Sequence, residues 1–267
     1  MSPKHLTPDK VDLTMAQISR FRRLKNRYRG SSPLTKDYEI LSNNKVTGWS
    51  VNFPIVRTCR PSKVCADTCY GLLGPITWLS SLEKQTRNYN WVKSDPVDFS
   101  LRLEQEVRRK LNKDSRFFLR WNGVGDLFEE SSEALRNLNR LVPELPIWCV
   151  TRIPEQVPPL KNIENVWVHF SLDRYSLERR VQVEKLTQGE MKNLFFSYQA
   201  DVCESIEKVP EGISVFFFDG YRVPPDSTLD LDHPSLCPLN LIENISNACH
   251  SCRRCFNGEG VNLTEKL

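Results

Sequence analysis

Apolar runs alternate with helical segments from residue 46 to residue 218, and this alternation leaves the chain few possible folds. Six runs rich in β-branched and aromatic residues predict strands, at 46–53, 117–121, 147–150, 166–170, 193–197 and 214–218. Helical segments separate most of them; in 97–112, for example, apolar residues recur every four positions and form one stripe. Strands that alternate with helices are typical of parallel βα units. We therefore expect an α/β fold, either a partial (βα)6 barrel or a doubly wound sheet.

Seven of the nine cysteines form two clusters, one directly after the first predicted strand and one near the end of the chain. The first cluster is Cys59, Cys65 and Cys69, and the second is Cys237, Cys249, Cys252 and Cys255. Short segments that carry three or four thiols bind soft metal ions and iron–sulfur clusters. Three protein ligands leave one coordination position open for chemistry, whereas four close the site. The uneven split predicts two metal sites of different kinds.

Other interpretations of the cysteines are open. The chain has no apolar run of the roughly 18–20 residues that a membrane span needs, and its start lacks the apolar stretch of a signal peptide. We therefore expect a cytoplasmic protein, in which thiols stay reduced and disulfides are rare. Ordinary buried thiols are the alternative for the first cluster. Zinc is the alternative for the second, because C-x2-C-x2-C suits tetrahedral thiolate coordination. The Cys237-Pro238 pair favours an iron–sulfur cluster, since ferredoxins combine a short cysteine run with a remote cysteine followed by proline.

Composition divides the chain into three parts. Residues 1–45 are expected to be irregular and basic, 46–223 carry the βα alternation, and 224–267 form a cysteine-rich extension. The segment from Arg20 to Arg29 interleaves aromatic and basic side chains, a pattern that suits nucleic acid. A solvated helix or arm is the alternative for this segment. The net charge of +4 does not decide between the two.

Polar residues follow most of the predicted strands. They are Asn122, Asp126, Thr151, Arg152, Ser171, Asp173, Tyr198 and Asp219. In parallel α/β folds ligands bind beyond the carboxyl ends of the strands, so these residues are expected to surround one site together with the first cysteine loop. Arg120 and Arg152 are candidates to bind a carboxylate or phosphate, or to pair with the aspartates. For Asp173 and Asp219, helix capping or turn formation is the alternative.

The remaining notable residues are expected to be structural. Cys149 and Cys203 have the surroundings of core thiols and are not expected to bind metal. Three tryptophans on predicted strands, Trp121, Trp148 and Trp167, are expected to pack in the interior. His250 is expected to lie outside the ligand set, because four thiolates already complete a site.

The arrangement resembles the radical S-adenosylmethionine superfamily. In that superfamily a three-cysteine loop after the first strand of a (βα)6 partial barrel binds a 4Fe–4S cluster, whose open iron binds S-adenosylmethionine. A small glycine-rich acidic motif after the second strand contacts the cofactor; the residues at the matching place are Gly123, Gly125 and Asp126. The loop here is C-x5-C-x3-C, whereas the superfamily pattern is C-x3-C-x2-C. For the glycine motif, a tight turn between strand and helix is the alternative.

A closer resemblance is to the bacteriophage family called gene product eighty-eight and to related radical-SAM-like phage proteins. The matching motifs are T-C-R-P-S-K-V-C-A-D-T-C-Y-G, R-W-N-G-V-G-D-L-F, C-V-T-R-I-P-E, N-V-W-V-H-F-S-L-D and the closing C-P…C-H-S-C-R-R-C-F. They occur in this order from about Phe53 to Phe256. The resemblance implies an iron–sulfur protein on a partial barrel in the host cytoplasm, and it implies no particular substrate.

The leading functional hypothesis is therefore an iron–sulfur protein with two 4Fe–4S clusters on a radical-SAM-like barrel. If S-adenosylmethionine binds, the first cluster would cleave it reductively and the protein would need an electron donor. The alternative is a non-enzymatic nucleic-acid-binding protein with structural zinc or iron–sulfur sites. A third hypothesis is one shared cluster with ligands from both ends of the chain.

Overall fold

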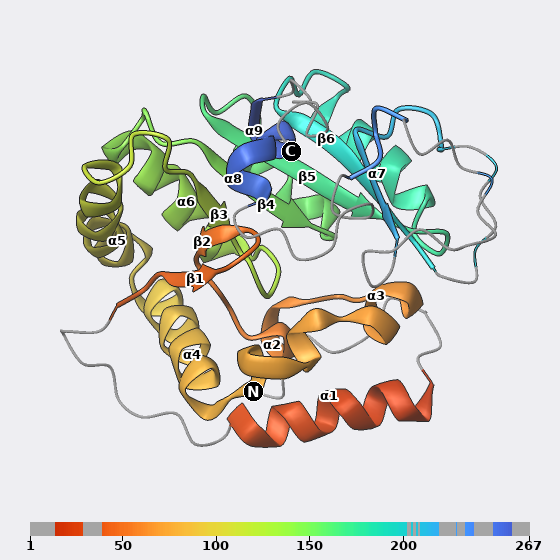
Figure 1. Cartoon of the computed structure of the whole chain (residues 1–267), viewed down its shortest axis with the longest axis horizontal. Helices are drawn as coiled ribbons and strands as arrows, with labels where there is room; N and C mark the ends of the chain where they lie inside the picture. The colour runs from red at the N-terminus through yellow and green to blue at the C-terminus, as the bar shows by residue number, and fades with distance from the viewer. Residues whose placement is uncertain are drawn as a thin grey trace.

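The computed structural model describes residues 14–28, 39–201, 204, 207, 209–218, 228, 233–237 and 248–257. Its centre is a seven-stranded sheet flanked by helices, so the chain is a mixed α/β protein, as the alternation predicts (Figure 1). The strands are β1 (Ser42–Asn44), β2 (Gly48–Ser50), β3 (Leu119–Trp121), β4 (Ile147–Thr151), β5 (Val166–Leu172), β6 (Leu194–Ala200) and β7 (Val215–Phe218). The six strands expected from the sequence are β2 to β7. The additional β1 forms a hairpin with β2, whose turn is held by the Asn44 side chain.

The strands lie in the sheet in the same order as in the chain, from β1 to β7. β1 is antiparallel to β2, and every later pair of neighbours is parallel. In such an order, right-handed crossovers place the connecting helices on one face of the sheet. This order excludes the doubly wound alternative, in which the strand order reverses at a switch point. Among the described residues β1 and β7 are the two edges, so the structure shows a sheet with sequential parallel strands but does not show a barrel.

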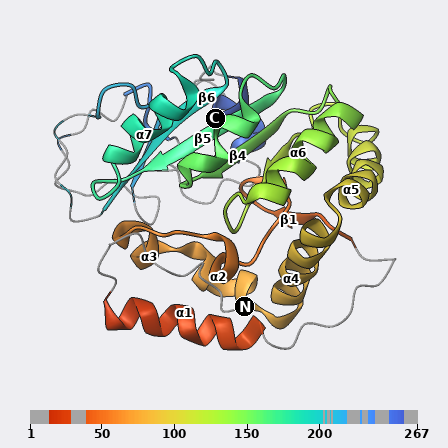
Figure 2. The ribbon, with the colours of Figure 1, turned by 180° about the vertical axis from the view of Figure 1, so that it is seen from behind.

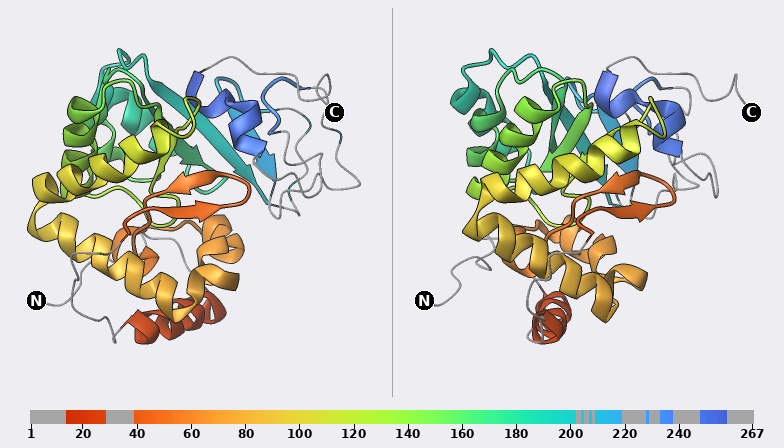
Figure 3. Two further views of the ribbon diagram at one scale, coloured as in Figure 1. Left: turned by 60° about the vertical axis from the view of Figure 1, so that its left-hand side comes forward. Right: turned by 90° about the vertical axis from the view of Figure 1, so that its left-hand side faces the viewer.

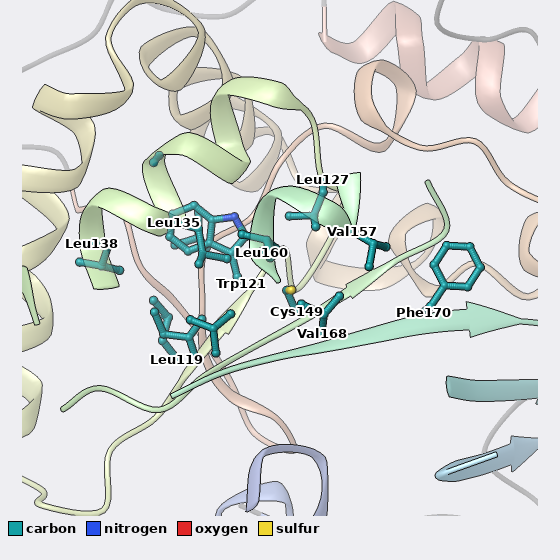
Figure 4. Packing of buried hydrophobic residues seen from close by; sticks show 14 of the residues in the cluster. Leu119, Trp121, Leu127, Leu135, Leu138, Cys149, Val157, Leu160, Val168 and Phe170 are labelled. Carbon is teal, nitrogen blue, oxygen red and sulfur yellow. The ribbon is translucent and has the colours of Figure 1, made fainter. Parts of the chain in front are cut away.

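The connecting helices cover one face of the sheet, and the main hydrophobic core lies between that face and the helices. These helices are α4 (Leu79–Ser94), α5 (Pro96–Leu111), α6 (Glu129–Leu141) and α7 (Glu178–Thr187), with the 3-10 turns η5 (Pro154–Gln156) and η6 (Pro158–Leu160). Figure 4 shows strand residues such as Trp121 and Phe170 packed in one cluster with Leu135 and Leu138 of α6. The predicted stripe of α5 faces this core, and its Phe99 and Leu103 are completely buried.

A smaller lobe contains α1 (Met15–Arg27), α2 (Ile55–Thr58), α3 (Lys63–Thr68), η3 (Tyr70–Leu72), η4 (Gly74–Thr77) and the start of α4. In Figures 1 and 2, α1 lies along the outside of this lobe. The expectation that residues 1–45 are irregular is wrong for α1. A capping box between Thr14 and Gln17 begins this helix, and Phe21 and Leu24 bury its inner side. In the segment from Arg20 to Arg29, residues 20–27 belong to α1 and Tyr28 caps its end. Arg29 lies outside the described residues.

The opposite face of the sheet carries the helices α8 (Ala248–Cys252) and α9 (Arg254–Asn257), which lie in front of β4 and β5 in Figure 1. Because side chains alternate along a strand, this face receives Arg120, Trp148, His169 and Gln199, while their neighbours enter the main core. None of the described helices combines the length and apolar character that crossing a membrane requires.

Candidate metal centres on one face of the sheet

The first cysteine loop is held by two short helices at the carboxyl ends of the strands. Cys59 is the residue that follows α2, and Ser62 caps the start of α3, where its hydroxyl accepts a hydrogen bond of 3.1 Å from the Cys65 amide. Cys65 lies within α3, and Cys69 is the residue that follows α3. All three thiols are partly buried. These short helices, the second of them capped by Ser62, bring the three cysteines close together although five and three residues separate them in the chain.

The three thiols of this loop interact with one another. Burial raises the pKa of Cys69 to about 12, and the neighbouring Cys65 thiol adds to this rise. Burial also raises the pKa of Cys59, with contributions from both other thiols. Cys59 and Cys69 pack against the apolar residues that line α1. Burial and mutual repulsion disfavour the thiolate form here, and a bound metal cation would stabilise it.

A buried polar network connects this loop to β4, β5 and β6. Arg152 Nη1 lies 2.6 Å from Asp173 Oδ2, and their side chains are 7% and 0% exposed. Arg152 also donates to Ser62 Oγ at 3.3 Å, and Ser62 donates to Asp173. On its other side Arg152 donates to Gln199 Oε1 at 3.2 Å, and Gln199 donates to Thr68 Oγ1 at 2.6 Å. Since Ser62 begins α3 and Thr68 is its last residue, the network holds both ends of the helix that carries Cys65.

The candidate cofactor-binding glycines, Gly123 and Gly125, pack against the chain that leads into the first cysteine loop. A β-carbon on Gly123 would lie 2.6 Å from Ser50 Cβ, and one on Gly125 would lie 2.6 Å from the Phe53 carbonyl oxygen. Gly125 also has a φ of +89°, which favours glycine. Close packing and a turn therefore account for both glycines, which is the alternative that the sequence left open.

Asp126, the third candidate cofactor-binding residue, is buried and fully engaged by neighbouring groups. Its carboxylate accepts hydrogen bonds from Thr151 Oγ1 at 2.6 Å, from the Leu127 amide at 2.7 Å and from the Arg152 amide at 3.2 Å. Burial raises the pKa of Asp126 to about 6, although these hydrogen bonds oppose the rise. The carboxylate thereby joins the end of β3 to the end of β4.

Replacing Gly125 by Ala is expected to lower the free energy of unfolding by about 2–4 kcal/mol, because the substitution adds backbone strain and a steric clash. Gly189→Ala is the matched control, since Gly189 also has a positive φ, of +68°, but an added β-carbon would have no atom within 4 Å. The control is expected to lose only about 1 kcal/mol. Urea unfolding measures both losses, and equal losses would contradict the tight contact with Phe53.

The second cysteine site combines two stretches of chain. The Cys237 amide donates to the Phe216 carbonyl at 2.8 Å, which places this cysteine beside β7. The Cys249 amide donates to the Val46 carbonyl at 3.2 Å, and the Cys255 carbonyl lies 2.7 Å from His169 Nε2. Burial raises the pKa of Cys249 to about 12, and Cys237 and Cys252 add to this rise.

The four thiols of the second site interact electrostatically. Burial raises the pKa of Cys255, and all three of the other thiols contribute. His250 is turned toward the surface, where Nε2 lies 3.1 Å from Asp114 Oδ2, so it is engaged outside the group of thiols. Burial lowers the pKa of His169 to about 4, so this ring is neutral where it meets the Cys255 carbonyl.

Arg120 lies between the two cysteine sites. Its Nη2 donates to the hydroxyl of Tyr70, the residue after Cys69, at 3.1 Å. Its guanidinium carbon lies 4.8 Å from the centre of the Trp148 ring. Trp148 in turn belongs to the small apolar cluster that packs against Cys249 and Cys255. Arg120 therefore contacts a residue beside each of the two cysteine sites.

The described part of the chain contains eight cysteines, and the structure forms no disulfide between any two of them. Within the same residues, no three side chains of His, Cys, Asp or Glu are arranged as a site for a metal ion. The fit of a metal or a cluster therefore depends on the donor set: one site offers three soft sulfur ligands and the other offers four.

The structure separates the other candidate residues into two groups. Asp173 pairs with Arg152, which is the pairing expected for one of the two arginines. Asp173 also forms a turn, because it accepts hydrogen bonds from the Tyr175 amide and the Ser176 hydroxyl. Ser171 is buried on the cysteine face. Tyr198 was expected beside the first cysteine loop, and this is wrong, because its side chain enters the main core.

Most of the residues expected to be structural are in the interior. Cys149 and Trp121 are completely buried in the main core. Trp148 is buried and Trp167 partly buried on the cysteine face, where both pack near the second site. Cys203 and Asp219 lie outside the described residues.

A mostly parallel sheet with two groups of thiols on one face defines an α/β protein with candidate sites for soft metals. The chain belongs to the family described as Gene product 88, whose family model matches residues 23–258. This match includes all seven strands and both cysteine clusters, and it confirms the family that the motifs indicated. Searches among curated proteins and among solved structures found no match.

Proposed function

We propose that the protein binds two iron–sulfur clusters on the same face of its sheet. The observation that carries the proposal is the assembly of two separate groups of mutually interacting thiols from three short stretches of chain. The ligands of the first cluster would be Cys59, Cys65 and Cys69, and those of the second Cys237, Cys249, Cys252 and Cys255. The positive charge of a bound cluster would stabilise the neighbouring thiolates, which otherwise repel one another.

A 4Fe–4S cluster at the first site would supply one-electron chemistry and one open coordination position. The chain's own residues position this site: Arg152 and Asp173 hold α3, and Gly125 allows the β3 end to approach the loop closely. Arg120 places a positive charge near the second group of thiols and Arg152 places one near the first, and both offset part of the negative charge that sulfur ligands carry. The second site has four ligands and is suited to holding structure or passing electrons.

Three features support a radical-SAM-like partial barrel as the finer description of the fold. Six parallel strands follow one another in sequential order, the three-cysteine loop comes directly after the first of them, and the loop lies at the carboxyl ends of the strands. Reductive cleavage of S-adenosylmethionine is the corresponding activity. Binding of S-adenosylmethionine would use the open coordination position of the first cluster, since Gly123, Gly125 and Asp126 already contact other parts of the protein.

The test is the content of iron, acid-labile sulfide and zinc in protein purified without oxygen. We expect about eight iron atoms and eight sulfides per chain, with a broad absorption band from thiolate-to-iron charge transfer. Adding S-adenosylmethionine is expected to change the spectrum of the first cluster only. Zinc without visible absorption would contradict the proposal and assign the thiols to structural zinc sites.

A further inference from the structure

We infer that the outer surface of the small lobe, formed by α1 and the turns around Trp78, binds single-stranded nucleic acid. This inference goes beyond the cluster proposal and does not depend on it. Its first basis is the uneven distribution of charge along the chain. Residues 1–94 contain 16 basic and 6 acidic residues, whereas residues 95–267 contain 21 basic and 27 acidic residues. The overall charge of +4 thus conceals a strongly basic first third and an acidic remainder.

The basic residues of α1 face the solvent. This helix contains five basic residues and no acidic one. Phe21 and Leu24 bury its inner side against the first cysteine loop, while Arg22, Arg23 and Arg27 are exposed on its outer side. Arg20 is also exposed and reaches the Asp67 carbonyl at 3.4 Å. Arg20, Arg23 and Arg27 are three and four residues apart, so they form a row along the helix that can contact successive phosphates of a nucleic acid backbone.

Exposed aromatic and apolar side chains lie in the same lobe. Trp78 is 62% exposed and Leu73 is 66% exposed. The end of α1 is joined to this region, because the Tyr28 hydroxyl donates to Gln85 at 2.6 Å and Gln85 donates to the Ile76 carbonyl of η4 at 3.1 Å. Figure 3 shows α1 at the outer edge of the lobe, beside the turns that lead into α4. Guanidinium groups and an exposed indole in the same lobe match the contacts that single strands make, with phosphates on the cations and bases stacked on the ring.

The same features argue for a single strand over a bilayer or a duplex. A membrane-binding amphipathic helix inserts its apolar side into the lipid, but the apolar side of α1 is buried in the protein. A duplex keeps its bases stacked inside the helix, so it offers no free base to the exposed indole of Trp78.

The test is fluorescence anisotropy with a labelled 20-nucleotide single strand, the matching duplex and anionic phospholipid vesicles, using full-length protein. The triple variant Arg22→Gln, Arg23→Gln, Arg27→Gln is expected to bind the single strand roughly 100-fold more weakly at 0.1 M salt, with a salt slope smaller by about 2. The matched control is Arg109→Gln, Lys185→Gln, Lys192→Gln, which removes the same charge from exposed positions outside the lobe. The control is expected to bind like the unmodified protein.

The Trp78 variants test the stacking part of the inference. Trp78→Ala is expected to lose about tenfold in single-strand affinity, whereas Trp78→Phe keeps most of it. Equal losses in the arginine variant and its charge-matched control would overturn the inference. Binding of the duplex as tight as that of the single strand, or a preference for vesicles, would overturn it as well. Because this assay does not measure iron, its outcome is separate from that of the cluster proposal.

Discussion

Replacing Cys65 by Ala is expected to halve the iron content of the anaerobically purified protein, from about eight to about four atoms per chain. Cys65 lies within α3, and the second site takes its four thiols from the other end of the chain. With only two thiols left, the first site loses its cluster, while the second keeps all of its ligands. Iron and sulfide analysis together with the visible absorption spectrum measures the loss.

Two further variants make this result interpretable. Cys149→Ala removes a cysteine that is buried in the main core and belongs to neither group of ligands. This variant is expected to keep the full iron content. Cys252→Ala is expected to remove the other half of the iron. Loss of all iron in both ligand variants would contradict two separate clusters and would indicate one cluster shared by the two ends of the chain.

Replacing Asp173 by Ala is expected to lower the free energy of unfolding by about 3–5 kcal/mol, because it leaves the charge of Arg152 buried without its partner. The Asp173 side chain is completely buried, and it also accepts the hydrogen bond of Ser62 at the start of α3. The substitution is therefore expected to destabilise the first cysteine loop as well as the ends of β4 and β5. Urea unfolding gives the change in stability, and the iron content reports the effect on the loop.

The matched control for Asp173 is an exposed ion pair on α7. Glu184 lies 2.9 Å from Arg180 at the i,i+4 spacing, and both side chains are well exposed. Glu184→Ala is expected to cost only about 0.5 kcal/mol, since water solvates the remaining charge. The double variant Arg152→Met, Asp173→Leu is expected to lose less than Asp173→Ala, because no buried charge is left unpaired. Similar losses for Asp173→Ala and Glu184→Ala would show that water reaches the Arg152 pair.

Local patterns in the sequence determined the elements of this protein well. The strands at 147–151 and 166–172 follow from short β-branched and aromatic runs, and α5 follows from an apolar stripe with a period of four. The two cysteine clusters could be recognised from spacing alone. The helix α1 was anticipated only as the alternative for the segment from Arg20 to Arg29, and its start was missed, because prolines and a glycine on both sides suggested an irregular segment. The capping pair Thr14 and Gln17, three residues apart, was the signal that could have identified its start.

The candidate site could be predicted only in part, because its geometry depends on residues far apart in the chain. The sequence indicated that Arg152 could pair with an aspartate, but it contained no sign that Gln199 and Thr68 complete the network, 131 residues apart. Glycine spacing suggested cofactor contacts for Gly123 and Gly125. Tertiary packing decides which atoms surround a glycine. Here β2 and the residues that follow it fill the space around both glycines.

The sequence by itself determined the α/β class, the order of the elements, the family and the two sets of candidate ligands, because periodicity and spacing are local properties of a chain. Only the tertiary structure decided that both sets of thiols lie on the same face of the sheet, with Arg120 between them. The physical reason is the sequential parallel order of the strands. It places the connecting helices on one face and leaves the other to the first cysteine loop and to the C-terminal helices.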